Sequence, residues 1–292
     1  MLARKPALML VLVLALTTAC RSKPSAGSGG TNAAPGTSAS AEPAPESPAV
    51  PPEEVQRAVN PGNEKPYSGP IGTVNGTVRV SGDPAPELTS VLAKIPPGRC
   101  DDARAFYGKL FREGPNRELG DVLVGVTGYK GFVPARAPGK LVKARGCAFE
   151  SRTIAMTFGQ QLEVLNKGPE TFIPELVGAH QAALLVAVPG GDPVKLFPTQ
   201  VGQFKLVDRS HEFAKADVFV LKYPTVAVTG LDGKFSIDGI PAGEVSVTAY
   251  LPATGQQASQ HVTITAGETA SVDLTIPFAA AKPAPSASAG PR

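Results

Sequence analysis

The stretch that decides the fold is residues 204–239, FKLVDRSHEFAKADVFVLKYPTVAVTGLDGKFSIDG. Short segments of alternating apolar and polar residues predict several strands here. These segments are 203–207, 218–222, 225–229 and 234–237. The Asp232-Gly233 pair between the last two predicts a tight hairpin, because such a turn needs positive backbone dihedrals. No linker divides the stretch, so we interpret it as the seam between two β-domains.

On both sides of this stretch the chain has the same pattern of short apolar segments separated by turn-forming residues. It holds 31 Gly and 30 Pro in 292 residues, and short apolar segments lie between these turn-forming residues. Frequent turns between short apolar segments predict an all-β protein. Residues 101–112 have helical spacing, although a twisted hairpin fits them equally well. The other candidate strands are 74–80, 121–126, 141–145, 149–157, 161–166, 182–188, 245–250, 261–265 and 270–276.

The second half of the seam resembles the carboxypeptidase-regulatory-like β-sandwich, also called transthyretin-like or prealbumin-like. The resemblance rests on TVAVTGLDGKFSIDGIPAGEVSVTAYLPATG at 225–255, with its Asp-Gly hairpin and Pro-Ala-Gly turn. GTVNGTVRVSG at 72–82 and DVLVGV at 121–126 look like earlier strands of that sandwich. The resemblance therefore implies a discontinuous sandwich, formed by 67–140 and 223–278 and interrupted by an inserted domain at 141–222. A long insertion is tolerated because loop-closure entropy grows slowly with length.

The inserted domain resembles the cupredoxin, or plastocyanin-like, family. CAFESRTIAMTFGQQLEVLNKGPETFIPEL at 147–176 matches a cupredoxin half at Gly159, Gln160, Leu162, Asn166 and Pro169. The first half of the seam matches the spacing of the family's closing copper motif. On this register the four copper-ligand positions hold Phe172, Asp208, His211 and Ala214.

These four residues cannot supply type 1 copper ligands. Such a site needs two imidazoles, one thiolate and a weak axial thioether. The resemblance therefore implies a degenerate cupredoxin-like domain, and we expect no metal cofactor. A shift of the loop would instead bring His180 to His211 and Asp208, a cluster suited to Zn²⁺ or Cu²⁺. The alternative is that His211 is a surface-turn histidine, and we expect His261 to face solvent.

The N-terminus has the layout of an export signal. Arg4 and Lys5 precede an apolar run at 7–16, which is too short to span a bilayer, and small residues then lead to Cys20. This layout resembles the bacterial lipobox, which implies a signal peptide at 1–20 and a lipidated Cys20. The alternative is an ordinary secretory signal with a free cysteine. Arg21 after the cysteine favours the outer membrane, with the protein facing the periplasm.

Two segments are too poor in bulky apolar residues to pack into a core. Residues 21–66, rich in Ser, Ala, Gly and Pro, predict a disordered tether, and 279–292 predict a disordered tail. Apart from Cys20, the cysteines are Cys100 and Cys147. An exported protein is expected to join such a pair in a disulfide, although two free buried thiols remain the alternative.

The sequence carries no motif that points to catalysis or to nucleic-acid binding. It lacks the Gly-x-Ser-x-Gly, Gly-Lys-Ser/Thr and His-Glu-x-x-His motifs, has three His in total, and has a net charge of +3 without a basic block. We therefore predict a non-catalytic lipoprotein of the bacterial cell envelope. It would be held at the membrane by its lipid and would bind an envelope protein or a polysaccharide. The alternatives are a metal-binding or redox protein and, because the first sandwich belongs to the carbohydrate-binding-like folds, a carbohydrate-binding module.

Overall fold

The all-β prediction is confirmed by the computed structural model, which describes residues 50–179 and 183–280. Short helices accompany the strands of this part of the chain, and none of them is long and apolar enough to cross a membrane. The helices are α1 (Pro52–Val59), α2 (Thr89–Leu92) and α3 (Asp101–Tyr107).

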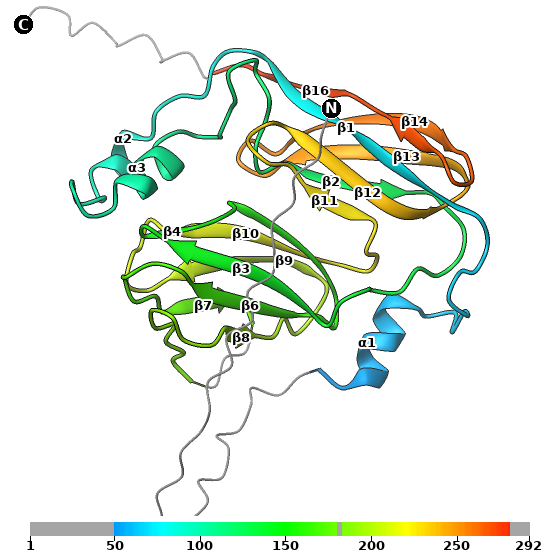
Figure 1. The fold of residues 1–292 in the computed structure, drawn as a ribbon, viewed down its shortest axis with the longest axis horizontal. Coiled ribbons are helices and arrows are strands. Elements are labelled where there is room, and N and C mark those ends of the chain that lie inside the picture. The colour runs from blue at the N-terminus through cyan, green and yellow to red at the C-terminus, as the bar shows by residue number, and fades with distance from the viewer. Residues whose placement is uncertain (1–49, 180–182, 281–292) are drawn as a thin grey trace, which may run out of the picture. The chain divides into compact units, whose positions relative to one another are not determined.

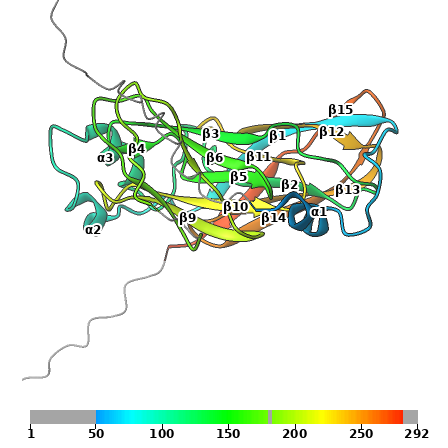
Figure 2. The ribbon, with the colours of Figure 1, turned by 90° about the horizontal axis from the view of Figure 1, so that it is seen from below.

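Two sheets drawn from distant parts of the chain form a first sandwich, whose strands are cyan, green (β2) and yellow to red in Figure 1. One sheet, whose β1, β12 and β15 are labelled in Figure 2, places β1 between β12 and β15. In addition, β16 pairs with β1. Its strands are β1 (Ile71–Gly82), β12 (Lys234–Pro241), β15 (Thr269–Ser271) and β16 (Leu274–Phe278). The other sheet has the order β11 (Val226–Val228), β2 (Leu123–Thr127), β13 (Gly243–Leu251) and β14 (Gln256–Ile264).

The core of the first sandwich follows from the alternation of its strands. Every second residue of β1, β12 and β13 turns inward, as period-two strands require. The inward side chains of both sheets meet in one buried cluster, which contains Val74, Val78, Val124, Val126, Phe235, Ile237, Val247 and Ile276.

A second sandwich is built from the green to yellow strands of Figure 1 and has its own core. One sheet has the order β5 (Thr153–Thr157), β10 (Lys215–Leu221), β9 (Gly202–Asp208) and β7 (Pro174–Val177). The other has the order β4 (Ala148–Phe149), β3 (Gly139–Arg145), β6 (Gln161–Asn166) and β8 (Val194–Leu196). The 182–188 strand is not found in its described part, where Ala187 forms only an isolated bridge to Phe172.

The segment around α3 packs into the second core, although the sequence assigned 67–140 to the first sandwich. Ile95, Cys100, Ala103 and Tyr107 are buried with the residues of β3 to β10. Ala103 and Tyr107 lie four positions apart and form the buried face of α3. Residues 101–107 therefore take the helical alternative, and the helix ends at Gly108.

The Asp232-Gly233 turn does not close a hairpin, so that expectation is wrong. β11 before the turn pairs with β2, whereas β12 after it pairs with β1 in the opposite sheet. Of the two turn residues only Gly233 has a positive φ, of 67°. A Cβ at Gly233 would lie 2.5 Å from the carbonyl oxygen of Val78. The glycine is thus needed because the turn crosses between sheets against β1.

Helix α1 lies inside the segment predicted to be a disordered tether. Its sequence PEEVQRAV places Val55, Ala58 and Val59 on one side, and all three pack against the second core. Val55 rests on Gly159, where a Cβ would lie only 2.6 Å from the valine side chain. Composition averaged over 21–66 hid this short amphipathic pattern. Residues 21–49 of the tether and 281–292 of the tail lie outside the described residues.

Candidate functional site

The four positions aligned with copper ligands come together at one end of the second sandwich. Phe172 precedes β7, and the other three lie at the end of β9 and in the loop to β10. This loop is closed by its own backbone: the Asp208 N–H donates to the Ala214 carbonyl at 3.1 Å, and the Ala214 N–H donates to the His211 carbonyl at 2.8 Å. Phe172, Asp208 and Ala214 are buried.

Asp208 is a buried carboxylate that binds donors with both of its oxygens. Oδ1 accepts hydrogen bonds from the backbone N–H of Ile173 at 2.6 Å and of Ser210 at 3.2 Å. Oδ2 lies 2.5 Å from Nδ1 of His211. Only 17% of the His211 side chain is exposed, so it is not the free surface-turn histidine of the alternative interpretation. The carboxylate therefore fixes both the position and the ring orientation of His211.

Two phenylalanines hold the His211 ring from its sides. Its centroid lies 5.5 Å from the Phe172 ring and 5.8 Å from the Phe213 ring. Phe172 also contacts Phe149, with ring centroids 6.0 Å apart, and thereby joins the sandwich core. The residue that stands where the resemblance expects a copper ligand is thus a packing residue beside the remaining imidazole.

A type 1 copper site does not fit these residues. Phe172 and Ala214 offer only hydrocarbon, and the oxygens of Asp208 are taken by two backbone N–H groups and His211. His211 is the one imidazole at the four positions, and no thiolate or thioether stands among them. This donor set lacks the ligands that type 1 copper needs.

The disulfide between Cys100 and Cys147 is present and lies next to His211. The two sulfurs and one imidazole nitrogen all lie within 4.8 Å of one another. Proximity of His211 to the disulfide was not predicted, because these residues are far apart in sequence and share no motif. His261 is exposed on β14, as expected, whereas Cys20 and His180 lie outside the described residues.

The comparisons with known proteins give a weak likeness. No family model matches the chain. No curated protein matches it either. A reduced mutant of amicyanin is similar to it at 17% identity, over 30% of this chain and 85% of amicyanin, with a TM-score of 0.26. A copper-containing nitrite reductase from Thermus scotoductus is similar at 13% identity, over 32% of this chain and 24% of the reductase, with a TM-score of 0.25.

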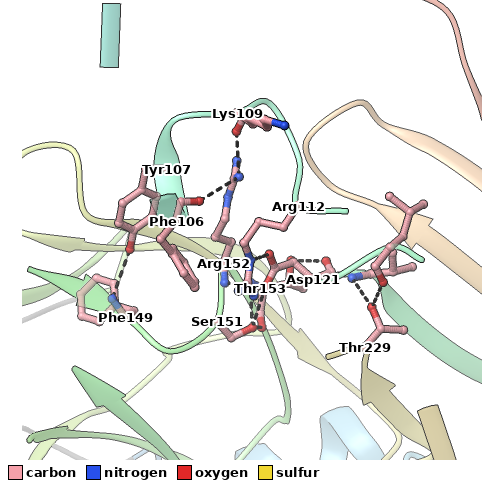
Figure 3. A network of polar contacts seen from close by, with 12 residues as sticks. Phe106, Tyr107, Lys109, Arg112, Asp121, Phe149, Ser151, Arg152, Thr153 and Thr229 are labelled. Carbon is pink, nitrogen blue, oxygen red and sulfur yellow. Dashed lines mark hydrogen bonds and ion pairs between the residues drawn. The ribbon is translucent and has the colours of Figure 1, made fainter. Parts of the chain in front are cut away.

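A second buried carboxylate, Asp121, organises a polar network between the two sandwiches (Figure 3). Arg112 binds both of its oxygens, through Nε and Nη2, at 2.6 Å each. Its Oδ1 also accepts from the Arg152 N–H at 2.9 Å and from the Ser151 hydroxyl at 3.2 Å. Asp121 has a φ of 62°, a costly conformation for a residue with a side chain. The network was not predicted, since the sequence places Asp121 only at the start of a strand.

The side chain of Arg152 extends this network to the segment after α3. Its guanidinium donates to the carbonyl oxygen of Lys109 at 2.9 Å (Figure 3). It also donates to the carbonyl oxygen of Leu110 at 2.7 Å. Burial lowers the pKa of Arg152, an effect that Asp121 partly offsets. Burial likewise raises the pKa of Tyr107, whose hydroxyl accepts from the Phe149 N–H at 3.2 Å. Both side chains thus tie the connecting segment to the second sandwich.

Proposed function

We propose that the chain is a lipid-anchored, non-catalytic module of the bacterial cell envelope that binds an acidic segment of another envelope protein. The lipobox-like sequence ending at Cys20 supports the anchor. Closure of the copper-ligand positions by Phe172, Asp208 and Ala214 supports a role other than type 1 copper chemistry. The observation that carries the proposal is a groove beside the network of Asp121.

This groove, called here the cationic groove, has a volume of about 690 Å³. Five basic and three acidic side chains line it. Most of these charges are paired: Lys143 lies 3.7 Å from Glu150, Arg145 lies 3.7 Å from Asp102, and Arg112 binds Asp121. Among residues 50–179 and 183–280, Lys109 and Lys167 have no carboxylate within ion-pair distance. The groove is therefore suited to an acidic ligand.

The groove also offers apolar surface, which favours a polypeptide over a purely polar polymer. Phe106 is half-buried under the Arg112 guanidinium, which lies 4.0 Å from the ring centroid. Leu231, at the tip of the turn before β12, is 50% exposed at the same groove. Protein interfaces combine such apolar centres with charged rims, where the charges set specificity and association rate. An acidic segment with an apolar residue is the ligand that matches both features.

In-cell photocrosslinking tests the groove. A photoreactive residue replaces Lys109 or Lys167 in the full-length chain, and a third version replaces exposed Lys195 on β8 as the matched control. We expect one protein to be captured from both groove positions and not from the control. Equal capture from Lys195, or capture of polysaccharide instead of protein, would contradict the proposal.

The captured protein is then purified and titrated with the full-length chain. Reversing two charges in the Lys109→Glu/Lys167→Glu variant is expected to weaken binding by about tenfold or more, mostly at low salt. The Lys195→Glu variant should bind as the unaltered chain does. Binding that is insensitive to the groove variant would locate the partner elsewhere.

The anchor is tested by labelling cells with a radioactive fatty acid. The unaltered chain should be labelled and should fractionate with membranes, whereas Cys20→Ser should be unlabelled. If both chains stay unlabelled, the lipoprotein part of the proposal is wrong while the groove remains testable.

Carbohydrate binding is the second candidate function, and one observation favours it. Tyr223 and Tyr250, which look scattered in the sequence, line one groove of about 210 Å³ on the first sandwich together with Thr127 and Thr248. Aromatic rings beside hydroxyls are a combination that suits sugars. Titration with soluble glycan fragments tests it, and a loss of binding in Tyr250→Ala but not in Tyr67→Ala is the expected result.

A further inference from the structure

A cluster of two sulfurs and an imidazole, from Cys100, Cys147 and His211, is not part of the lining of the cationic groove. We propose that reduction of the Cys100–Cys147 disulfide creates a metal site, in which Cys100, Cys147 and His211 bind one thiophilic d¹⁰ cation, Cu(I) or Zn²⁺. In the oxidised chain the sulfurs are bonded to each other. The oxidation state of one disulfide would therefore decide whether the protein holds a metal.

Three separate segments bring the donors together. Cys100 stands directly before α3, Cys147 lies in the turn between β3 and β4, and His211 lies in the loop between β9 and β10. One donor atom from each lies within 4.8 Å of the other two. Breaking the S–S bond lets the sulfurs separate by rotation of their side chains, and a cation about 2.0 to 2.3 Å from each donor then fits between them.

His211 is already held in the way that metal-binding histidines are held. Such a histidine usually donates its second ring nitrogen to a carboxylate, which fixes the tautomer and makes the metal-binding nitrogen more basic. Nδ1 of His211 lies 2.5 Å from the Asp208 carboxylate, which leaves Nε2 available for a ligand. Asp208 is in turn fixed by the N–H groups of Ile173 and Ser210. The imidazole thus needs little reorganisation to bind a metal.

The backbone of Cys147 adopts a left-handed conformation, which residues other than glycine rarely adopt. The two residues between β3 and β4 are Gly146, with a φ of 57°, and Cys147, with a φ of 60°. Turns of this kind favour Asn-Gly or Gly-Gly, because a residue such as cysteine is disfavoured in the left-handed conformation. This conformation places the sulfur beside Cys100 and His211. Backbone strain at a residue with a reactive side chain is common at functional sites.

The donor set selects the class of cation. Thiolates are soft ligands that prefer Cu(I) and Zn²⁺ over hard cations such as Mg²⁺ or Ca²⁺. Two thiolates neutralise Zn²⁺, which suits a buried site, and leave one position of a tetrahedron for water. Three donors also complete a trigonal site for Cu(I). Both ions fit the same chemistry, and the experiment separates them.

Opening the site is a thiol–disulfide exchange with a dithiol reductant. A thiolate of the dithiol attacks one sulfur of the pair and displaces the other as a thiolate, which gives a mixed disulfide. The second thiol of the reductant then attacks the reductant's own sulfur in this mixed disulfide. The second cysteine is released as a thiolate, and the reductant is left as a cyclic or internal disulfide. Two electrons and two protons pass to Cys100 and Cys147, and the dithiol is oxidised. Metal binding afterwards displaces the two thiol protons.

The test compares the oxidised and the reduced full-length chain, solubilised in detergent. One sample is reduced without oxygen by a dithiol and then desalted, and both samples are titrated with Cu(I) and, separately, with Zn²⁺ against coloured chelators. We expect the reduced chain to bind one equivalent of at least one ion, with thiolate-to-metal absorption in the ultraviolet. The oxidised chain should bind neither ion at that affinity.

Variants assign the ligands. His211→Gln should weaken the metal site by at least tenfold, and Asp208→Asn by about tenfold, because ligand and supporting carboxylate both contribute. His261→Gln on exposed β14 is the matched control and should leave affinity unchanged. Cys100→Ser/Cys147→Ser should abolish binding, and circular dichroism shows whether this variant and the reduced chain keep their β-sheet.

Several results would overturn the proposal. One is a reduced chain that binds neither ion above the double cysteine variant. Another is binding that His211→Gln leaves intact, since the thiols alone would then hold the metal. Loss of the β-sheet on reduction would also contradict it, because His211 would no longer lie beside the two sulfurs. None of these outcomes bears on the cationic groove of the oxidised chain, which is tested separately.

Discussion

Asp121 and Asp208 are two buried carboxylates with opposite roles. Asp121 lies between the sandwiches and binds the guanidinium of Arg112, which is always charged, together with Ser151 and the Arg152 N–H. Asp208 lies at one end of the second sandwich and binds two backbone N–H groups and an imidazole. The first carboxylate is fully engaged in joining two domains. The second holds His211 through Nδ1 and leaves Nε2 outside that contact.

The difference shows how similar burial can serve structure in one place and chemistry in another. A carboxylate paired with Arg112 leaves no donor that a ligand could use. A carboxylate paired with a histidine passes its effect to the far ring nitrogen, and the imidazole of His211 lies beside the disulfide. Substitutions in the two regions should therefore differ in kind, with loss of stability around Asp121 and loss of stability together with ligand binding around Asp208.

The largest effect on stability is expected from removing the disulfide. Its cysteines are 47 positions apart, so Cys100→Ser/Cys147→Ser should lower the free energy of unfolding by about 4 kcal/mol in the chain-entropy model. Urea unfolding of the oxidised chain and the variant measures this. The unaltered chain, reduced, should unfold at nearly the same urea concentration as the variant, and a loss below about 1 kcal/mol would contradict the expectation.

Breaking the Asp121 network should lower the free energy of unfolding slightly less than removing the disulfide does. Asp121→Asn removes the charge that Arg112 faces and should lower the free energy of unfolding by about 3 kcal/mol, because a largely buried guanidinium is left without its counter-charge. Asp273→Asn is the matched control, since its pair with Arg79 is exposed and loosely spaced at 3.6 Å. The control should cost less than about 1 kcal/mol. Equal losses in both variants would mean that burial of the pair does not matter.

Asp208→Asn should have a smaller effect on stability and a specific effect on His211. The amide oxygen can still accept from Ile173 and Ser210, so we expect a loss of about 1 to 2 kcal/mol from the bond to His211 alone. Nuclear magnetic resonance of the imidazole should report a changed tautomer or ring orientation. An unchanged His211 spectrum would show that the flanking phenylalanines, and not Asp208, orient the ring.

The smallest effect is expected at an exposed ion pair. A hydrogen bond from Arg136 lowers the pKa of Asp238 below its ordinary value. The folded-state pKa is thus below the unfolded one, so the pair stabilises the fold above the unfolded pKa, and this contribution disappears as the pH falls through the folded pKa. Arg136→Gln should return the pKa of Asp238 towards its ordinary value in a titration by nuclear magnetic resonance. An unchanged pKa would exclude Arg136 as the cause.

Local patterns in the sequence predicted the fold class and most strands. Alternation in 74–80, 218–222 and 245–250 reports which side chains face a core, and β1, β10 and β13 lie there. The Asp232-Gly233 turn was placed correctly, but its partner strands were not. Turn chemistry fixes the local backbone and carries no information on which sheet the next strand enters.

The two polar sites could be predicted only in part. The resemblance to cupredoxins predicted that Asp208 and His211 lie at one site, because both belong to one short motif. Arg112, Asp121 and Arg152 meet through the packing of two sandwiches, and no spacing in the sequence encodes that meeting. The same holds for His211 beside Cys100 and Cys147, whose proximity depends on where α3 docks.

The interrupted first sandwich has a consequence for the order of folding. Thr77 on β1 hydrogen-bonds to Asp273, 196 positions later, and β16 pairs with β1 in parallel. The second sandwich instead pairs strands within one continuous stretch, from β3 to β10, and its widest pairing joins Thr153 to Asp217. Chains with distant pairings fold slowly, and unpaired strand edges are prone to aggregation meanwhile. As the chain emerges from its N-terminus, β1 must wait for almost the whole chain, while the second sandwich can fold first and bring the two parts of the first sandwich together.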